Sequence, residues 1–196
     1  VNWDSQEIAK RIGADHPNRE AKPIKRILFD SRQFSMGEGQ LFFALVGKHH
    51  DGHNYIEELY LKGIRVFVVQ GISSNNLEDA IFLKVEDSLK ALQMLGKGIR
   101  TSIDPRLVAV TGSNGKTVVK EWLYRLLAHQ AKAYRSPKSF NSQIGVPLSL
   151  WGMPEDTEIG IFEAGISQPH EMHHLAEILK PRFGIFTNIG SAHGEN

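Results

Sequence analysis

The chain has 196 residues, enough for one or two domains, and its 41% hydrophobic and 23% charged residues are ordinary for a globular protein. The net charge is +1 without a long basic run, so we expect no nucleic-acid partner. Cysteine is absent, which excludes disulfides and thiolate metal sites, and no stretch approaches the roughly 18 apolar residues of a membrane span. We therefore expect a soluble cytoplasmic protein.

The first half of the chain alternates short helix and strand patterns and predicts a small α/β domain. Asp4 or Ser5 is a candidate cap for a helix that carries Ile8 and Ile12, and a second helix over residues 56–60 is stopped by Gly63. Apolar runs predict strands at 27–29, 41–45, 66–69 and 81–85, and spaced leucines predict a helix over 89–99, weakened at its end by two glycines. We expect domains at 1–102 and 103–196, with the boundary in Thr101–Pro105.

The second half alternates strands and helices more regularly. Strands are expected at 107–110, 131–134, 158–162 and 183–187, and helices after Lys116 and over 168–179. The helix after Lys116 is amphipathic, with apolar residues at Val119, Trp122, Leu123, Leu126 and Leu127. This order predicts a mostly parallel, doubly wound α/β domain.

The turn after the strand at 107–110 predicts a phosphate-binding loop. Gly112 and Gly115 permit a tight turn that aims backbone N–H groups at phosphate oxygens, Lys116 supplies a positive charge, and Thr117 offers a hydroxyl to Mg²⁺. Val110 stands where the usual pattern has its first glycine, so the loop is a variant. The flanking strand and helix favour nucleotide binding over a structural turn, but the loop alone does not specify a reaction.

Two further candidates follow other strands of the same expected sheet. Ligands of open α/β sheets collect beyond the carboxyl ends of the strands. Glu163 ends one strand there and is a candidate Mg²⁺ ligand or water-positioning group, with a capping or solvated carboxylate as the alternative. His193 lies in a loop beyond another strand, where a solvent-facing histidine is an equal alternative.

Four segments in this order resemble the motifs of the Mur ligases of peptidoglycan synthesis: Thr111–Thr117, Asn141–Pro147, Glu163–Gly165 and Thr187–His193. The segments Phe29–Arg32, Gly37–Leu45 and Gly47–His53 are similar to the UDP-sugar-binding domain of the later-acting members, so the resemblance covers nearly the whole chain. Residues 163–172 are most similar to the members that add D-alanyl-D-alanine, because the diamino-acid-adding members have a serine-rich segment there.

The resemblance implies an ATP-dependent ligase that joins D-Ala-D-Ala to UDP-N-acetylmuramoyl tripeptide through an acyl phosphate. It gives Lys116, Glu163 and His193 as catalytic residues and Thr117, Glu163 and His193 as the surroundings of Mg²⁺. ATP would contact Gly112, Ser113, Asn114, Gly115, Lys116 and Thr117. The UDP substrate would lie near Ser31, Arg32, Asp51 and His53, with Asn141 facing it from the central domain.

Family members continue with the rest of the ATPase domain and with a further domain for the incoming amino compound. We therefore expect this chain to be an N-terminal fragment that does not ligate by itself, and to be a monomer. A sister enzyme remains an alternative, either the diamino-acid-adding Mur ligase or a folylpolyglutamate synthase, although the latter would not need the motifs of the first domain. A non-catalytic nucleotide-binding module is a third alternative.

Overall fold

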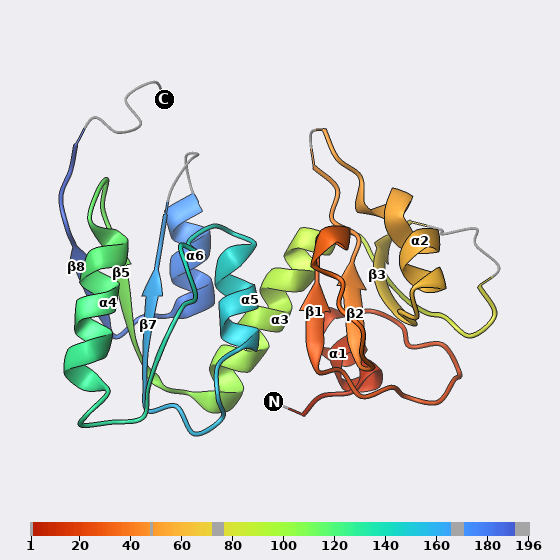
Figure 1. Ribbon diagram of the computed structural model, residues 1–196, viewed down its shortest axis with the longest axis horizontal. Coiled ribbons are helices and arrows are strands. Elements are labelled where there is room, and N and C mark those ends of the chain that lie inside the picture. The colour runs from red at the N-terminus through yellow and green to blue at the C-terminus, as the bar shows by residue number, and fades with distance from the viewer. Residues whose placement is uncertain (1, 48, 72–76, 166–170, 191–196) are drawn as a thin grey trace. The chain divides into compact units, whose positions relative to one another are not determined.

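The computed structural model describes residues 2–47, 49–71, 77–165 and 171–190 (Figure 1). The chain forms two compact units, Asn2–Leu95 and a second that begins at Gly96. Both are built on parallel sheets, which confirms the α/β fold class. Among the described residues, no helix has the length and apolar character needed to cross a membrane.

The N-terminal unit contains a four-stranded parallel sheet. Its strands lie in chain order, β1 (Arg26–Leu28), β2 (Gln40–Phe43), β3 (Val66–Gln70) and β4 (Ile81–Val85). The helices are α1 (Ser5–Ile12), α2 (Ile56–Leu61) and the first part of α3 (Ser88–Ile103), with 3-10 turns η1 (Ser31–Gln33) and η2 (Gly52–Tyr55). Each predicted helix and strand of this unit is present: β4 has the predicted bounds, and the others have shifted ends.

The apolar runs become strands because both faces of this sheet are covered. Leu41, Phe42 and Phe43 are consecutive, so they point to alternate faces, and all three are inaccessible to solvent. One face packs Phe42 and Phe67 against α2. Asp4 caps α1, as its position predicted, by accepting a hydrogen bond from the backbone N–H of Glu7 at 2.8 Å.

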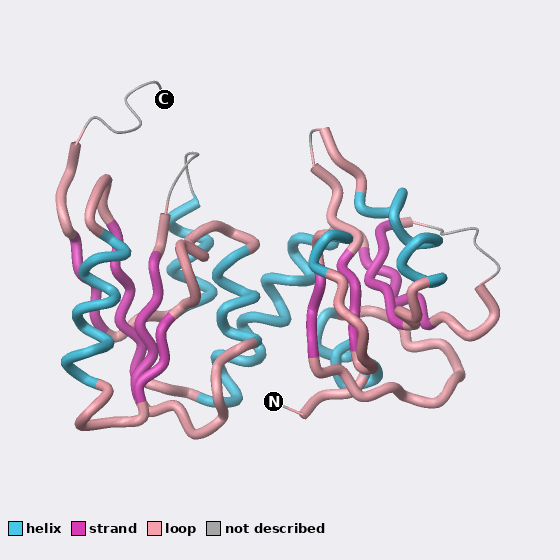
Figure 2. The backbone as a smooth tube through the Cα atoms, viewed as in Figure 1, coloured by secondary structure: helices cyan, strands magenta, loops and turns pink. Residues whose placement is uncertain are grey.

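The second unit contains another four-stranded parallel sheet, in the order β6-β7-β5-β8 (Figure 2). The strands are β5 (Arg106–Thr111), β6 (Ala133–Arg135), β7 (Ile159–Glu163) and β8 (Phe183–Phe186), and the helices are α4 (Lys116–Leu127), α5 (Gly145–Trp151) and α6 (Glu171–Leu179). Right-handed crossovers require α4 on one face and α5 and α6 on the other. The strand order reverses around β5, so the loop after β5 lies where such sheets bind ligands.

Helix α3 differs from the sequence prediction, since it continues past two glycines to Ile103 and includes part of the segment that was expected to be a linker. A Cβ on Gly96 would lie 3.0 Å from Pro147 of α5, so glycine permits these helices to approach closely. Arg100 then donates to the carbonyl of Leu179 at 2.8 Å. The two compact units divide within this helix, between Leu95 and Gly96. The domain boundary expected at residues 101–105 stays a prediction.

Two other elements differ from expectation. Helix α5 was not predicted, although Val146 and Leu150 are buried and anchor it. In α4 the expected apolar face is divided, because Trp122 and Leu126 are 64% and 67% exposed while a lysine on the same helix is fully buried.

Candidate nucleotide-binding site

The predicted phosphate loop joins β5 to α4. Gly112 has φ of 128° and Gly115, at the N-cap of α4, has φ of 80°, so both occupy backbone conformations that favour glycine. A Cβ on Gly112 would lie 2.2 Å from the hydroxyl of Thr187, just beyond β8. The chain therefore needs glycine at 112 both for its backbone angle and for the close approach of the neighbouring strand end.

The loop directs its polar groups inward and toward the segment after β8. The ammonium of Lys116 donates to the carbonyls of Gly112 at 2.6 Å and Ser113 at 3.3 Å. The backbone N–H groups of Ser113 and Asn114 donate to the carbonyl and the side-chain oxygen of Asn188, at 3.0 and 2.9 Å. Backbone N–H groups and a lysine ammonium can bind phosphate oxygens. In this structure they donate to carbonyl and side-chain oxygens of the protein itself.

Glu163 lies at the end of β7, in register with Val110 of β5. Its side chain is fully buried, and its Oε2 accepts a hydrogen bond from the Thr117 hydroxyl at 3.2 Å. The structure thus brings Thr117 and Glu163 together, as the sequence predicted. His193 lies outside the described residues.

These two side chains fit a divalent cation. Oε1 of Glu163 is buried and accepts no hydrogen bond from any described residue, although the ammonium of Lys120 lies 3.0 Å away as an ion pair. Neighbouring ligands of an octahedral Mg²⁺ lie roughly 3 Å apart, close to the 3.2 Å between the Thr117 and Glu163 oxygens. No group of three or more histidine, aspartate or glutamate side chains forms a metal cluster in the described part of the chain.

Lys120 is a residue of this cluster that sequence reasoning missed. It follows Thr117 by three positions on α4, so the two side chains share a helix face. That spacing was a usable signal, but a lysine in an amphipathic helix is ordinarily a solvated residue. In the structure it is buried beneath the helix, against the sheet.

Asn141 lies near the same sheet edge. Its backbone carbonyl accepts a hydrogen bond from the N–H of Gly165 at 2.9 Å, two residues after Glu163. A Cβ on Gly165 would lie 2.8 Å from the carboxamide carbon of Asn141, so the glycine leaves room for that side chain. The structure therefore brings Asn141 to the end of β7.

The predicted substrate residues Ser31 and Arg32 form the turn η1 after β1. Asp30 caps this turn by accepting a hydrogen bond from the backbone N–H of Arg32 at 3.0 Å. The Arg32 guanidinium also donates hydrogen bonds to this carboxylate from its Nε and a terminal nitrogen. The hydrogen bonds from the Arg32 side chain are the main reason that the pKa of Asp30 is lowered to about 2. The Arg32 side chain is 87% exposed.

Asp51 and His53 belong to the turn η2. Asp51 accepts from the backbone N–H of His53 at 2.9 Å, which is the main reason that the pKa of Asp51 is lowered. The ring Nε2 of His53 accepts from the backbone N–H of Gln70 at 3.0 Å, so its proton is on Nδ1, 2.6 Å from Asp51 Oδ1. Both ring nitrogens of His53 thus form hydrogen bonds within the protein. Gly52, between these two residues, packs closely on Ala44: a Cβ on Gly52 would lie 2.8 Å from the Cα of Ala44.

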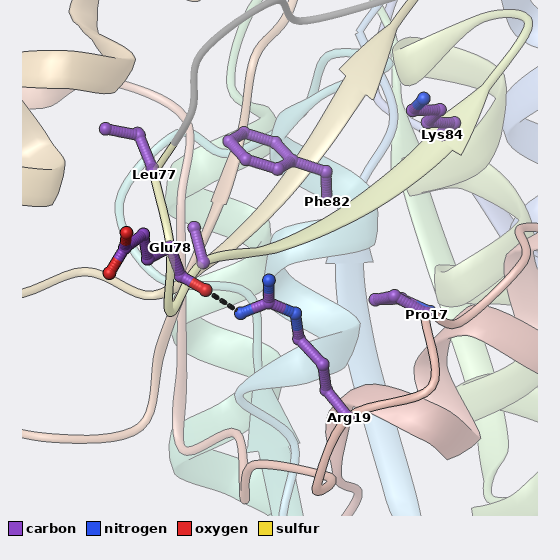
Figure 3. A pocket seen from close by; sticks show the side chains of 7 residues that line it. Pro17, Arg19, Leu77, Glu78, Phe82 and Lys84 are labelled. Carbon is purple, nitrogen blue, oxygen red and sulfur yellow. Dashed lines mark hydrogen bonds between the residues drawn. The ribbon is translucent and has the colours of Figure 1, made fainter.

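A surface hollow of about 550 Å³ lies beside β4 in the N-terminal unit (Figure 3). It is lined by Pro17, Arg19, Leu77, Glu78, Ala80, Phe82 and Lys84. Figure 3 shows that Arg19 reaches across to the backbone carbonyl of Glu78. None of the predicted site residues lines this hollow.

Two models of known families match the chain: the Mur ligase family, catalytic domain, over residues 23–131, and the Mur ligase middle domain, over residues 110–196. Among curated proteins, the UDP-N-acetylmuramoyl-tripeptide--D-alanyl-D-alanine ligase of Bacillus subtilis is 34% identical over 91% of this chain. The enzyme of the same name from Rickettsia prowazekii is 35% identical over 98%. The chain spans 38% and 42% of the length of these two relatives.

Solved structures show the same similarity. The UDP-N-acetylmuramoylalanyl-D-glutamyl-2,6-diaminopimelate--D-alanyl-D-alanyl ligase of Acinetobacter baumannii aligns with a TM-score of 0.89 and 28% identity, over 99% of this chain and 43% of that one. The MurF ligase of Thermotoga maritima, solved in complex with ADP, aligns with a TM-score of 0.75 and 31% identity, over 86% of this chain and 38% of that one. With the catalytic-domain model covering more than half of its residues, the chain belongs to the Mur ligase family.

Proposed function

We propose that the chain is the N-terminal part of an ATP-dependent ligase that joins D-Ala-D-Ala to UDP-N-acetylmuramoyl tripeptide. The observation that carries the proposal is the buried Glu163 carboxylate beside Thr117 at the end of the phosphate loop. The names of the relatives that are 34% and 35% identical support this substrate pair. The diaminopimelate-adding ligase among the solved structures is 16% identical, a level that supports the shared fold alone.

In this proposal, residues 103–196 contribute to the ATP site and residues 1–102 bind the UDP precursor. The N–H groups of the loop residues Gly112 to Thr117 hold the phosphates, and Lys116 turns from its loop carbonyls toward the outer phosphate oxygens. Thr117 and Glu163 hold Mg²⁺, with His193 as a third group. When bound, Mg²⁺ neutralises charge on the phosphates during transfer.

The chemistry brings two anions together. The terminal carboxylate of the tripeptide attacks the γ-phosphorus of ATP, which forms an acyl phosphate and releases ADP. The amine of D-Ala-D-Ala then attacks the acyl carbon, which forms the amide and releases phosphate and the proton lost by the amine. Lys116 offsets the repulsion in the first step, which depends mainly on positioning and electrostatic stabilisation.

The N-terminal unit supplies the residues for the UDP substrate. Ser31 and Arg32 lie in a turn at the carboxyl end of β1, and the exposed guanidinium of Arg32 is accessible to an anionic group. Asp51 and His53 shape the turn beyond β2. Asn141, hydrogen-bonded to Gly165 in the second unit, is the remaining residue proposed for substrate binding. The proposal also includes a cytoplasmic location and a monomeric state.

The test is ADP release by the full-length protein with UDP-N-acetylmuramoyl tripeptide, with and without D-Ala-D-Ala. Release that requires both substrates, and falls by roughly 10²–10³-fold in Lys116→Ala, supports the proposal. Lys132→Ala is the matched control, because Lys132 pairs with Asp156 at the surface, 3.0 Å away. We expect no turnover by the 196-residue chain alone.

Other outcomes would redirect the assignment. ADP release that depends on a diamino acid instead of D-Ala-D-Ala would move the chain to the sister ligase. ADP binding without substrate-dependent release would favour a nucleotide-binding module.

A further inference from the structure

Lys120 occupies an unusual position for a lysine. Its side chain is fully buried on α4, while Trp122 two residues later is 64% exposed. An ammonium group is expensive to remove from water unless charged and polar partners replace the solvent. The burial of Lys120 therefore depends on the groups around its Nζ.

Those groups come from three segments of the second unit. Nζ donates to the carbonyls of Ser136, at 2.9 Å, and Lys138, both just after β6. It lies 3.0 Å from Oε1 of Glu163 at the end of β7, and 3.5 Å from Glu121 on its own helix. Lys120 thus joins α4, the segment after β6 and the end of β7 at one point.

The same contacts hold Glu163 from two sides. Oε1 faces the ammonium of Lys120, and Oε2 faces the hydroxyl of Thr117. The backbone N–H of Glu163 lies 3.4 Å from the hydroxyl of Ser136, whose own N–H donates to Ile161 of β7. With one oxygen turned toward Lys120, the other is directed at the phosphate loop.

We propose that Lys120 is a positioning residue that fixes the Glu163 carboxylate so that Oε2 faces the phosphate loop and a cation held there. This inference rests on the proposed function, because it takes Glu163 as a cation ligand. Lys120 itself touches neither nucleotide nor cation.

The test measures ADP affinity of the full-length protein at equilibrium, with and without Mg²⁺, which needs no turnover. Lys120→Met removes the charge and the donors and keeps a side chain of similar length. We expect the Mg²⁺-dependent gain in ADP affinity to fall by about 10- to 100-fold, as when groups that orient metal ligands are removed. ADP affinity without Mg²⁺ stays unchanged, because the phosphate loop is intact. Lys120→Arg, which keeps the charge, restores part of the Mg²⁺ response.

Two further variants make the test specific. Glu121→Gln is the matched control: this carboxylate also neighbours Lys120 but pairs with Arg135 at 2.8 Å, and its loss should change neither affinity. The double variant Lys120→Met with Glu163→Gln removes both buried charges together. Since Lys120 acts through Glu163, the double variant should show the same Mg²⁺ response as Glu163→Gln alone. If Lys120→Met does not fold, the partial Mg²⁺ response of Lys120→Arg carries the test.

An equal loss of ADP affinity with and without Mg²⁺ in Lys120→Met would overturn the proposal, because Lys120 would then only stabilise the helix. Independent, additive effects of the two substitutions would overturn it too, as would an unchanged Mg²⁺ response in Glu163→Gln. Failure of the proposed function is distinguishable from these results. A protein that lacks ligase turnover but keeps the Lys120-dependent Mg²⁺ response refutes the ligase assignment and supports the positioning role.

Discussion

In both sheets of this chain, carboxylates lie at or beyond the carboxyl ends of strands, but their hydrogen-bond partners differ. In the N-terminal unit, Asp30 and Asp51 each follow a strand and cap a 3-10 turn through a backbone N–H of that turn. In the second unit, Glu163 caps no helix: its Oε1 pairs with the buried ammonium of Lys120 at 3.0 Å, and its Oε2 accepts a hydrogen bond from the Thr117 hydroxyl at 3.2 Å. A carboxylate satisfied by its own turn holds the backbone, whereas a carboxylate directed at the phosphate loop can also take a ligand.

The surroundings of these carboxylates differ as much as their hydrogen bonds. Asp30 pairs with an arginine that is 87% exposed, so water and salt screen the attraction. Glu163 and Lys120 are 1% and 0% exposed as side chains, where the lower dielectric strengthens every interaction and raises the cost of removing one partner. Substitutions at the second sheet should therefore have the larger effects.

The largest expected effect follows Glu163→Gln. The substitution removes the negative charge next to the phosphate loop and keeps the shape of the side chain, so we expect kcat for substrate-dependent ADP release to fall by roughly 10²–10³-fold. Asp51→Asn should cause a smaller fall, since asparagine caps a turn about as well as aspartate. Steady-state kinetics of the full-length protein measure both. Equal losses of kcat would remove the distinction between the two sheet edges.

The next effect concerns glycines that contact a neighbouring backbone in each unit. In Gly112→Ala, the new Cβ would lie 2.2 Å from the Thr187 hydroxyl at a φ of 128°, so we expect a loss of about 2–4 kcal/mol in the free energy of unfolding. In Gly52→Ala only crowding against Ala44 arises, because no positive φ is involved, and about 1–3 kcal/mol is expected. Urea unfolding measures both losses.

Gly115→Ala is the control for backbone strain alone. Its φ is 80°, and no atom lies within 4 Å of an added Cβ. A loss of about 1 kcal/mol is expected there. If Gly115→Ala proved as costly as Gly112→Ala, the contact with Thr187 would not be the cause.

A third prediction concerns His53, which joins the turn η2 to the end of β3. His53→Ala removes the acceptor for the N–H of Gln70 and the donor to Asp51, so we expect a loss of about 1–3 kcal/mol in unfolding free energy. His173→Ala is the control, since that ring is 75% exposed on α6. A stability equal to that of the unsubstituted protein would show that solvent replaces both hydrogen bonds of His53 at little cost.

Local pattern was enough to predict most of this fold. The runs at residues 41–43 and 66–69 are apolar and buried on both faces, and the phosphate loop is marked by glycines between a strand and a helix. Glu163 was predicted because parallel strands place their carboxyl ends at one edge. These inferences need only neighbouring residues and one rule of topology.

The remainder depends on contacts between distant segments. Lys120 is buried because Ser136, Lys138 and Glu163 meet beneath it, and no periodicity in α4 reveals that meeting. Trp122 fits the apolar stripe of the same helix and yet lies in solvent. Gly96 does not break α3 because Pro147 packs against it. For Lys120 and Gly96, tertiary contact overrides local preference.

The smallest expected effect is at Arg32, and it separates two causes of one pKa shift. The pKa of Asp30 is lowered from 3.8 to about 2, mainly by the side chain of Arg32 and secondarily by its backbone N–H. The stabilisation that accompanies this shift is present above pH 3.8 and is lost as the pH falls through about 2. In Arg32→Ala the backbone N–H remains, so the pKa should rise only part of the way, as an NMR titration of the Asp30 carboxyl carbon would measure. A value that stayed near 2 would make Asp30 resemble Asp51, whose pKa is lowered first by a backbone N–H, and would assign both carboxylates to holding their turns.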